Sequence, residues 1–286
     1  MVRRSFNSAL WMCGGLLVWL VVGCGLAEPD PVSLETANVE PNASVDALAI
    51  CLREGVTDDG LMRPEWLRDN RDDLRRQLRL FAVTGPTVTP ELYPTEADRI
   101  AYWYNARAGW AIMLAILGQY ESDDWRLRQL PRRFPLDGRS MSLALIDDEL
   151  ASRDDWRIVA AAPGASLQRA RLPSEPFDAN GVRECIADRL DAFLDDEQRF
   201  VIDVEAQAVR VPPVLWRVRE RILAEYRNKY DARGANLLTA LLPHASTSTT
   251  RRLQDAVGYR IVPAKRRSRI LAILDEFGEF GSEAIK

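Results

Sequence analysis

The feature that most constrains the fold is a long apolar stretch between Thr95 and Gly118, which predicts a single buried helix. Thr95 followed by Asp98 is typical of a capping box at a helix start, and glycine is a common helix terminator. Apolar residues recur at helical spacing through the stretch, and residues 108–117 are apolar on nearly every side. A helix of this kind is buried on most of its faces. We therefore expect the rest of the domain to pack around it.

Two polar side chains, Asn105 and Arg107, interrupt this apolar helix. With them, the stretch is too short and too polar to cross a lipid bilayer. Buried polar groups require hydrogen-bond partners. We therefore expect Asn105 to be a structural residue that ties the helix to a neighbouring loop or strand.

Length, charge and histidine content restrict the class of protein. The chain has 286 residues, a length that fits one sizeable domain plus tails. Its apolar content is ordinary and its formal net charge is −4, which argues against a nucleic-acid-binding protein. A single histidine, His244, leaves little scope for a His-rich metal site or for His-dependent catalysis. We predict no metal and no cofactor.

The first 23 residues have the pattern of a targeting signal. Arg3 and Arg4 form a basic start, residues 9–22 are largely apolar, and the segment ends in Val21-Val22-Gly23-Cys24. This ending resembles a lipobox, which implies cleavage before Cys24 and a diacylglycerol on its thiol. The expected location is the bacterial cell envelope, with the domain lipid-anchored and facing the periplasm or the exterior. The alternative is an uncleaved signal anchor that carries a cytoplasmic domain.

The remaining sequence predicts a tether, one domain and a tail. Residues 24–45 lack periodicity and predict a flexible tether, and residues 263–286 predict a charged tail. Residues 46–262 predict a helix-rich α+β domain with a small antiparallel sheet, and Asp178 is the expected N-cap of one helix. The predicted helices cover residues 46–54, 64–83, 95–118, 143–151, 179–194, 214–230, 236–242 and 249–256. The predicted strands cover hairpins at 134–143 and 199–211, a buried run at 156–162 and a last strand at 259–262. For the run at 156–162, periodicity alone does not exclude a helix.

Several segments resemble one family. Tyr102-Trp103-Tyr104-Asn105-Ala106 resembles the Phe-Trp-Ile-Asn-Ala signature of the bacterial domain of unknown function 547. The hairpin end at residues 139–143, the segment Glu175-Pro176-Phe177 and the segment Val214-Leu215-Trp216 fit the same family in the same order. The resemblance covers roughly residues 60–262. It implies a fold related to papain-like cysteine peptidases and a thiolate nucleophile with a histidine base.

The residues for that chemistry are missing from this chain. An ungapped match puts Gly164 and Arg169 where the family has its two cysteines, and it puts Ser166 in the family's serine position. Val159 and the pair Asp147-Asp148 stand where the family usually has a histidine and a Glu-His pair. Without a thiol that can ionise, there is no cysteine nucleophile. The resemblance therefore implies a degenerate domain that binds a partner protein or a cell-wall component.

A ligand cleft at this loop is one reading of the same residues. Gly164, Ser166, Arg169 and Asp147 are its candidate lining, and Arg169 would suit an anionic group. An enzyme is the rival reading, in which Ser166 acts as nucleophile with His244 as base. We expect the ligand cleft in preference to catalysis.

Two further chemical hypotheses rest on acidic and thiol side chains. Paired carboxylates at residues 147–149 would serve acid–base work, although consecutive residues on a helix point in different directions. Cys185 is expected to be a buried apolar thiol rather than a nucleophile. In an oxidising envelope Cys51 and Cys185 can form a disulfide, and the sequence leaves that pairing open.

Overall fold

The computed structural model describes residues 30–118 and 131–264. The signal segment, Cys24 and most of the charged tail lie outside this range. Within it, no helix is long and apolar enough to cross a membrane. The described chain forms an α+β fold rich in helix, as predicted, but its strands form two sheets, of two and three strands, instead of one.

The central helix α4 (Glu96–Leu117) confirms the main prediction. Thr95 and Asp98 form the capping box, in which Asp98 N donates to Thr95 Oγ1 at 3.1 Å and Thr95 N donates to Asp98 Oδ2 at 2.9 Å. Gly118 closes the helix. Every residue from Ile100 to Ala115 is buried, so α4 is the axis around which this half of the domain packs.

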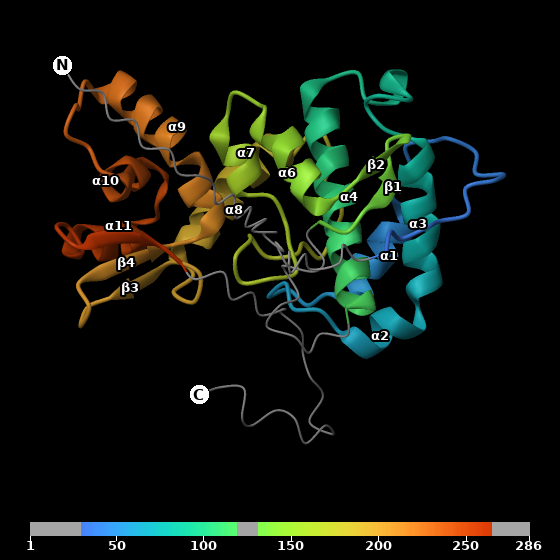
Figure 1. Cartoon of the computed structure of the whole chain (residues 1–286), viewed down its shortest axis with the longest axis horizontal. Coiled ribbons are helices and arrows are strands. Elements are labelled where there is room, and N and C mark those ends of the chain that lie inside the picture. The colour runs from blue at the N-terminus through green and yellow to red at the C-terminus, as the bar shows by residue number, and fades with distance from the viewer. Residues whose placement is uncertain (1–29, 119–130, 265–286) are drawn as a thin grey trace, which may run out of the picture.

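Three helices and a hairpin surround α4 in the right half of Figure 1. They are α1 (Asp46–Gly55), α2 (Pro64–Asp69), α3 (Arg71–Val83) and the strands β1 (Phe134–Leu136) and β2 (Arg139–Met141), with the short 3-10 helix η1 (Pro90–Leu92) nearby. The sequence predicted one helix over residues 64–83, but the chain breaks at Asn70, whose side chain donates to Trp66 O at 2.9 Å. The side chain thus bonds locally to the backbone at the break. The antiparallel hairpin turns at Asp137 and Gly138, both with positive φ, as predicted.

The middle of the molecule contains α6 (Leu143–Ala151), α7 (Trp156–Ala160) and α8 (Val182–Asp195). The predicted strand at 156–162 is wrong, because its first part forms α7. Asp155 caps that helix by accepting from Arg157 N at 2.9 Å, and a short apolar run does not distinguish helix from strand by periodicity. Helix α8 also starts later than predicted, since Asp178 Oδ1 accepts from Asn180 N and Gly181 N in a turn before it.

The left half of Figure 1 holds a small mixed sheet and three further helices. The sheet order is β3 (Val201–Asp203), β4 (Ala208–Val211), β5 (Arg260–Pro263). Strands β3 and β4 are antiparallel as predicted, but β5 runs parallel to β4, so this sheet is mixed rather than purely antiparallel. The helices are α9 (Pro213–Tyr230), α10 (Leu237–Leu241) and α11 (Thr247–Asp255), with the 3-10 helix η2 (Leu242–His244) after α10.

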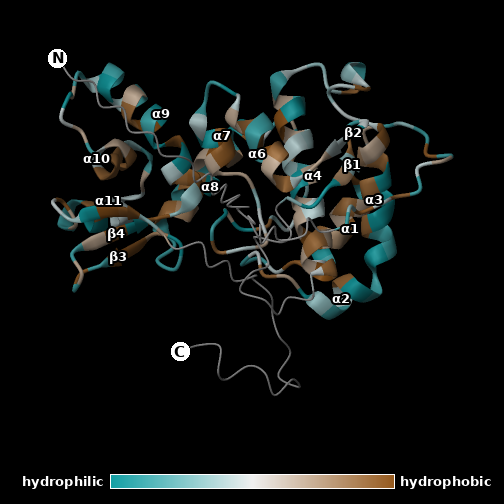
Figure 2. Ribbon diagram, viewed as in Figure 1, coloured by the Kyte–Doolittle hydropathy of each residue, from teal (hydrophilic) through white to brown (hydrophobic). Residues whose placement is uncertain are grey.

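One continuous apolar core joins the two halves, running from α1 and α4 through α7 and α8 to α9. Hydrophobic residues lie on the inner faces of the helices in Figure 2. Part of the predicted tether also packs on the domain. Val32 N donates to Arg133 O at 2.8 Å, and Val32 and Leu34 lie against the core. The described part of that segment is therefore a surface strap rather than a free linker.

Candidate functional site

Asn105 is the structural tie that the sequence predicts. Its side chain is buried and makes a two-way bond with the backbone of Phe177, which lies 72 residues further along the chain. Asn105 Nδ2 donates to Phe177 O at 2.8 Å, and Phe177 N donates to Asn105 Oδ1 at 2.8 Å. This pair fixes the loop before α8 against the middle of α4.

A buried ion triad connects Arg107 on α4, Asp147 on α6 and Arg169 in the loop after α7. Arg107 Nε donates to Asp147 Oδ1 at 2.8 Å, and Arg169 Nη2 donates to the other oxygen of the same carboxylate. The three side chains are only 2%, 5% and 9% exposed, in the order Arg107, Asp147, Arg169. Arg107 also donates to Pro163 O, and Arg169 donates to Val159 O at 3.2 Å. The triad therefore joins α4, α6 and the loop into one unit.

The charge pattern of the triad fixes the protonation state of Asp147. Burial by itself would raise the pKa of this carboxyl, but the guanidiniums of Arg107 and Arg169 outweigh burial and hold the pKa below its usual value. Asp147 is therefore ionised at neutral pH, with each oxygen bonded to an arginine. A carboxylate held in this way is a poor general acid or base.

The same triad leaves no room for a side chain at Gly164, where the family resemblance implies a cysteine. A Cβ atom at Gly164 would lie 2.7 Å from Arg169 Cβ and 2.9 Å from Arg107 Nη1, closer than side-chain atoms pack. Any side chain at Gly164 would thus collide with the two arginines. The four residues expected to line a cleft, Gly164, Ser166, Arg169 and Asp147, are all buried, and none of them lines either cavity described below.

Ser166 and His244 stand in different surroundings. Ser166 is buried, and its backbone carbonyl accepts from Arg169 N at 3.1 Å. His244 lies in η2 with its ring against Trp156, 5.1 Å between centroids, and burial lowers its pKa. Among the hydrogen bonds given for the described residues, none joins Ser166 to His244. The chain therefore presents no assembled serine–histidine pair here.

The acidic run and the two thiols are also accounted for structurally. Asp148 pairs with Arg217, whereas Glu149 pairs with Arg153 at 3.2 Å, so these neighbours point apart from Asp147. Both Cys51 and Cys185 are free thiols, so the open question of their pairing is answered in the negative for this structure. In the described part of the chain, no group of three or more His, Cys, Asp and Glu side chains is placed to hold a metal.

A hollow with charged and apolar lining lies elsewhere, between the loop 170–178 and α8. Its volume is about 470 Å³, a size that fits small-molecule pockets. Arg171, Arg189 and Arg199 contribute guanidiniums to it, while Phe177 and Phe193 contribute aromatic walls. A second cavity of about 490 Å³ lies beside the start of α4 and the ends of α7 and α8.

Sequence reasoning missed the first cavity. It placed a candidate ligand cleft at Gly164, Ser166 and Arg169, assigned no role to the rest of the loop up to Pro176, and did not use Arg189. A signal was nevertheless present, because Arg189 follows Ile186 by three residues and precedes Phe193 by four, which places it on the inward stripe of α8. An arginine on that stripe is a marker of a buried or cavity-lining charge.

Comparisons of the chain with protein-family models, with curated proteins and with solved structures found no match. The described residues combine a buried triad at the loop after α7 with a separate cavity that is lined by arginines and aromatic rings.

Proposed function

We propose that this protein is a bacterial envelope lipoprotein, anchored through a lipid on Cys24, whose domain is a degenerate relative of papain-like cysteine peptidases and serves as a non-catalytic binding module. Its ligand is a cell-wall component or a partner protein. The observation that carries the proposal is the buried Arg107–Asp147–Arg169 triad, with whose arginines a side chain at Gly164, the position matched to a family cysteine, would collide.

The physical reason is the demand of peptidase chemistry. A papain-like mechanism needs a low-pKa thiolate, a base within about 3 Å and oxyanion donors beside them. Burial raises the pKa of Cys185, and it raises the pKa of Cys51 to about 11, so neither described thiol is a ready nucleophile. No observation in the described chain favours the hydrolase that would use Ser166 and His244.

The catalytic part of the proposal is tested with activity-based probes. The full-length chain, purified in detergent, is treated with a thiol-directed peptidase probe and, separately, with a fluorophosphonate. We expect no stoichiometric labelling by either probe. Labelling of Cys51 or Cys185 that disappears on heat denaturation would overturn the non-catalytic reading. Fluorophosphonate labelling that is lost in Ser166→Ala would instead establish the serine hydrolase.

The anchoring part is tested by metabolic labelling with an alkyne fatty acid in a bacterial host. The wild-type chain should carry the label and migrate as a processed form, whereas Cys24→Ser should accumulate as an unlabelled precursor. A wild-type chain that stays at full length without acyl label would favour the uncleaved signal anchor.

A further inference from the structure

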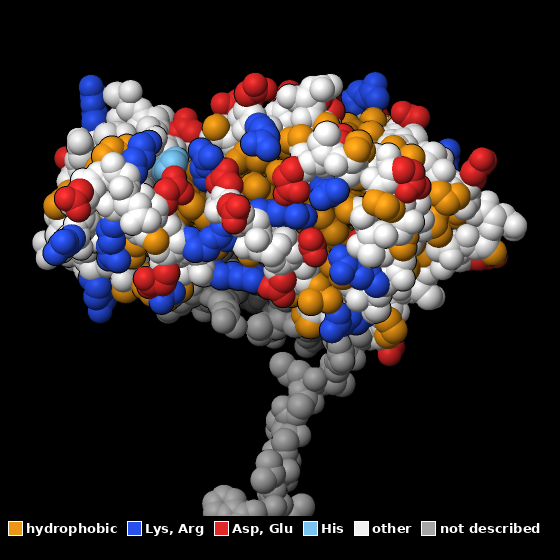
Figure 3. Space-filling view, turned by 90° about the horizontal axis from the view of Figure 1, so that it is seen from above, with side chains coloured by type: hydrophobic (Ala, Val, Ile, Leu, Met, Phe, Trp, Pro, Cys, Tyr) orange, Lys and Arg blue, Asp and Glu red, His pale blue; other side chains and the backbone are white. Residues whose placement is uncertain are grey.

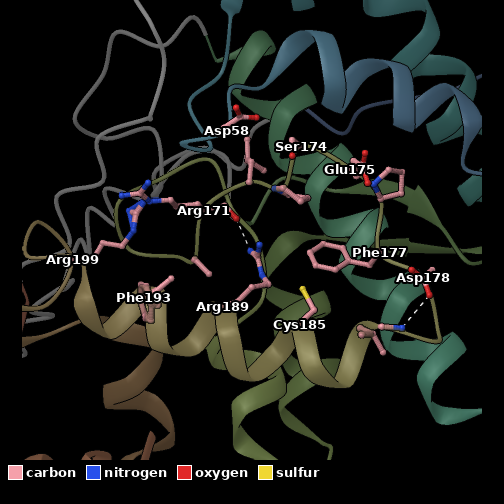
Figure 4. A pocket seen from close by; sticks show the side chains of 17 residues that line it. Asp58, Arg171, Ser174, Glu175, Phe177, Asp178, Cys185, Arg189, Phe193 and Arg199 are labelled. Carbon is pink, nitrogen blue, oxygen red and sulfur yellow. Dashed lines mark hydrogen bonds between the residues drawn. The ribbon is translucent and has the colours of Figure 1, made fainter. Parts of the chain in front are cut away.

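We propose that the cavity between the loop 170–178 and α8 binds a small organic carboxylate, with its head on Arg189 and Arg199 and its apolar body against Phe177. This inference rests on the proposed function, because it names the ligand class that a non-catalytic binding domain would hold. It concerns a different place in the fold from the loop at Gly164. Figure 4 shows Arg189 rising from α8 into the cavity, with Phe177 on one side and Arg171 and Arg199 on the other.

Arg199 is the first reason to expect an anion. Only 4% of the residue is exposed, and its Nη1 is a buried donor that has no hydrogen-bond partner in the described chain. Its Nε is paired with Asp196 Oδ2 at 3.0 Å. A buried guanidinium donor without an acceptor is unfavourable, so an acceptor supplied by a ligand would stabilise it.

The charges around Arg199 are the second reason. Arg171 Nη2 contacts the same Asp196 oxygen at 3.2 Å, so one carboxylate serves two guanidiniums. Asp59, which contacts Arg171 Nη1 at 3.2 Å, is a largely exposed partner. Burial lowers the pKa of Arg199, and the nearby cations Arg171 and Arg189 lower it further against the opposing effect of Asp196. Asp58 also lines the cavity, so the charge around it is not positive overall, but in the described part of the chain only Asp196 is paired with the buried Arg199, and Arg171 shares that carboxylate.

Arg189 is the third cation, and its hydrogen-bond partners among residues 30–118 and 131–264 are neutral carbonyl groups. Its Nε donates to Ala161 O at 3.0 Å and its Nη2 donates to Arg171 O. None of the ion pairs given for the described residues includes Arg189. Its guanidinium lies over the ring of Phe177, 5.1 Å from the centroid, which orients the group at the cavity wall. A guanidinium that is fixed by carbonyls and an aromatic ring is preorganised for a carboxylate.

The rest of the lining selects the kind of anion. Leu172, Pro173, Pro176 and Phe193 give the cavity apolar walls, which favour an organic body over a bare inorganic ion. Glu175 and Asp178 lie at the end that Figure 4 shows opposite Arg171 and Arg199. Acidic side chains there disfavour a ligand with a second negative charge. The ligand is therefore a compact monoanion with an apolar or aromatic body.

The face of the molecule that Figure 3 shows carries no extended run of positive charge among its described residues. On the face that it shows, basic and acidic side chains are interspersed with apolar ones. A long anionic polymer needs an extended run of positive charge, whereas a single carboxylate needs only one cluster of guanidiniums. The position of Phe177 is itself fixed, since both its backbone groups bond to Asn105.

The test uses the full-length chain in detergent, with N-acetylphenylalanine as the probe and its neutral amide, N-acetylphenylalaninamide, as the matched ligand. Binding is followed by isothermal titration calorimetry and by thermal melts at constant ionic strength. We expect the acid to bind and the amide not to bind. At about 100 times the Kd, the acid should raise the Tm by about 5–10 °C.

Arginine variants distinguish binding by the guanidiniums of this cavity from a general effect of the charge of the protein. Arg199→Met should weaken the Kd at least about tenfold, since it removes the buried donor. Arg171→Met is the second variant, because Arg171 is exposed and its loss leaves the fold intact even if Arg199→Met fails to fold. Arg183→Met is the control, since Arg183 is an exposed arginine on the same helix outside this cavity.

Each outcome decides one question. Equal binding of acid and amide, or unchanged binding in Arg171→Met and Arg199→Met, would overturn the carboxylate site. Tm shifts with sodium phosphate as large as those with the acid would replace the organic carboxylate by an inorganic anion and overturn the assignment. The probe is finally recovered and analysed by mass spectrometry. If N-acetylphenylalanine binds but is recovered chemically altered, the non-catalytic function is refuted and the binding site stands. If it does not bind, and the activity-based probes also leave the chain unlabelled, only the carboxylate site is refuted.

Discussion

Replacing Asn105 by leucine tests how strongly the central helix holds the cavity wall. The substitution keeps the branched shape and the number of heavy atoms of the side chain but removes both hydrogen bonds to Phe177, which are each 2.8 Å long and buried. It leaves one backbone N–H and one backbone C=O without partners. Each such orphaned group costs about 1–3 kcal/mol, so we expect the free energy of unfolding to fall by about 2–5 kcal/mol.

The assay is urea unfolding followed by tryptophan fluorescence, with thermal melts in parallel. For a domain of this size, a loss of 1 kcal/mol lowers the Tm by about 2–4 °C, so Asn105→Leu should melt about 5–15 °C below wild type. The dependence of the unfolding free energy on urea should stay the same, since the buried surface hardly changes.

Asn228→Leu is the matched control, because Asn228 is exposed on α9. It should change the unfolding free energy by no more than about 0.5 kcal/mol. If the curves of Asn105→Leu and wild type coincide, the backbone of Phe177 has found other partners. Asn105 would then not be the tie between α4 and the loop, and the reasoning would be refuted.

The remaining predictions concern the triad and the thiols. Asp147→Asn should lower the free energy of unfolding by about 3–5 kcal/mol in urea titrations, because it leaves the guanidiniums of Arg107 and Arg169 buried without a counter-charge. A loss below about 1 kcal/mol would show that the two arginine side chains move out into water. Since the pKa of Asp147 is lower in the folded chain, its contribution is fully present above its ordinary pKa of about 3.9 and is lost as the pH falls through the lower folded value. In melts between pH 7 and pH 2, the gap between wild type and Asp147→Asn should therefore close only below about pH 4, and a constant gap would contradict this. Gly164→Cys should lower the free energy of unfolding by about 1–3 kcal/mol, since its Cβ would collide with Arg169. Peptidase probes should leave the new thiol unlabelled, and a stable, labelled variant would show that the site is open. Cys51, buried and with its pKa raised to about 11, should react with iodoacetamide at pH 8 only after denaturation, as mass spectrometry of the alkylated peptide would show.

The sequence by itself determined the features that depend on neighbours along the chain. Helix α4, its capping box at Thr95 and its end at Gly118 follow from apolar spacing and from side chains that bond to nearby backbone groups. The role of Asn105 could also be predicted, because a polar amide inside an apolar helix must find a partner. The sequence pattern predicted a strand where residues 156–160 form a helix, because a short apolar run with small residues is compatible with both.

Only the tertiary structure decided which distant groups meet. Asp147 lies 40 residues from Arg107 and 22 from Arg169, and no periodicity in the sequence indicates that one carboxylate would serve both. The grouping of Arg189 with Arg199 around a cavity likewise depends on how the loop 170–178 folds over α8. Burial and charge pairing are set by the three-dimensional packing of whole elements. For that reason the sequence offered only a resemblance that implies a lost catalytic site at Gly164, whereas the structure was needed to find the Arg107–Asp147–Arg169 triad and the separate cavity at Arg189.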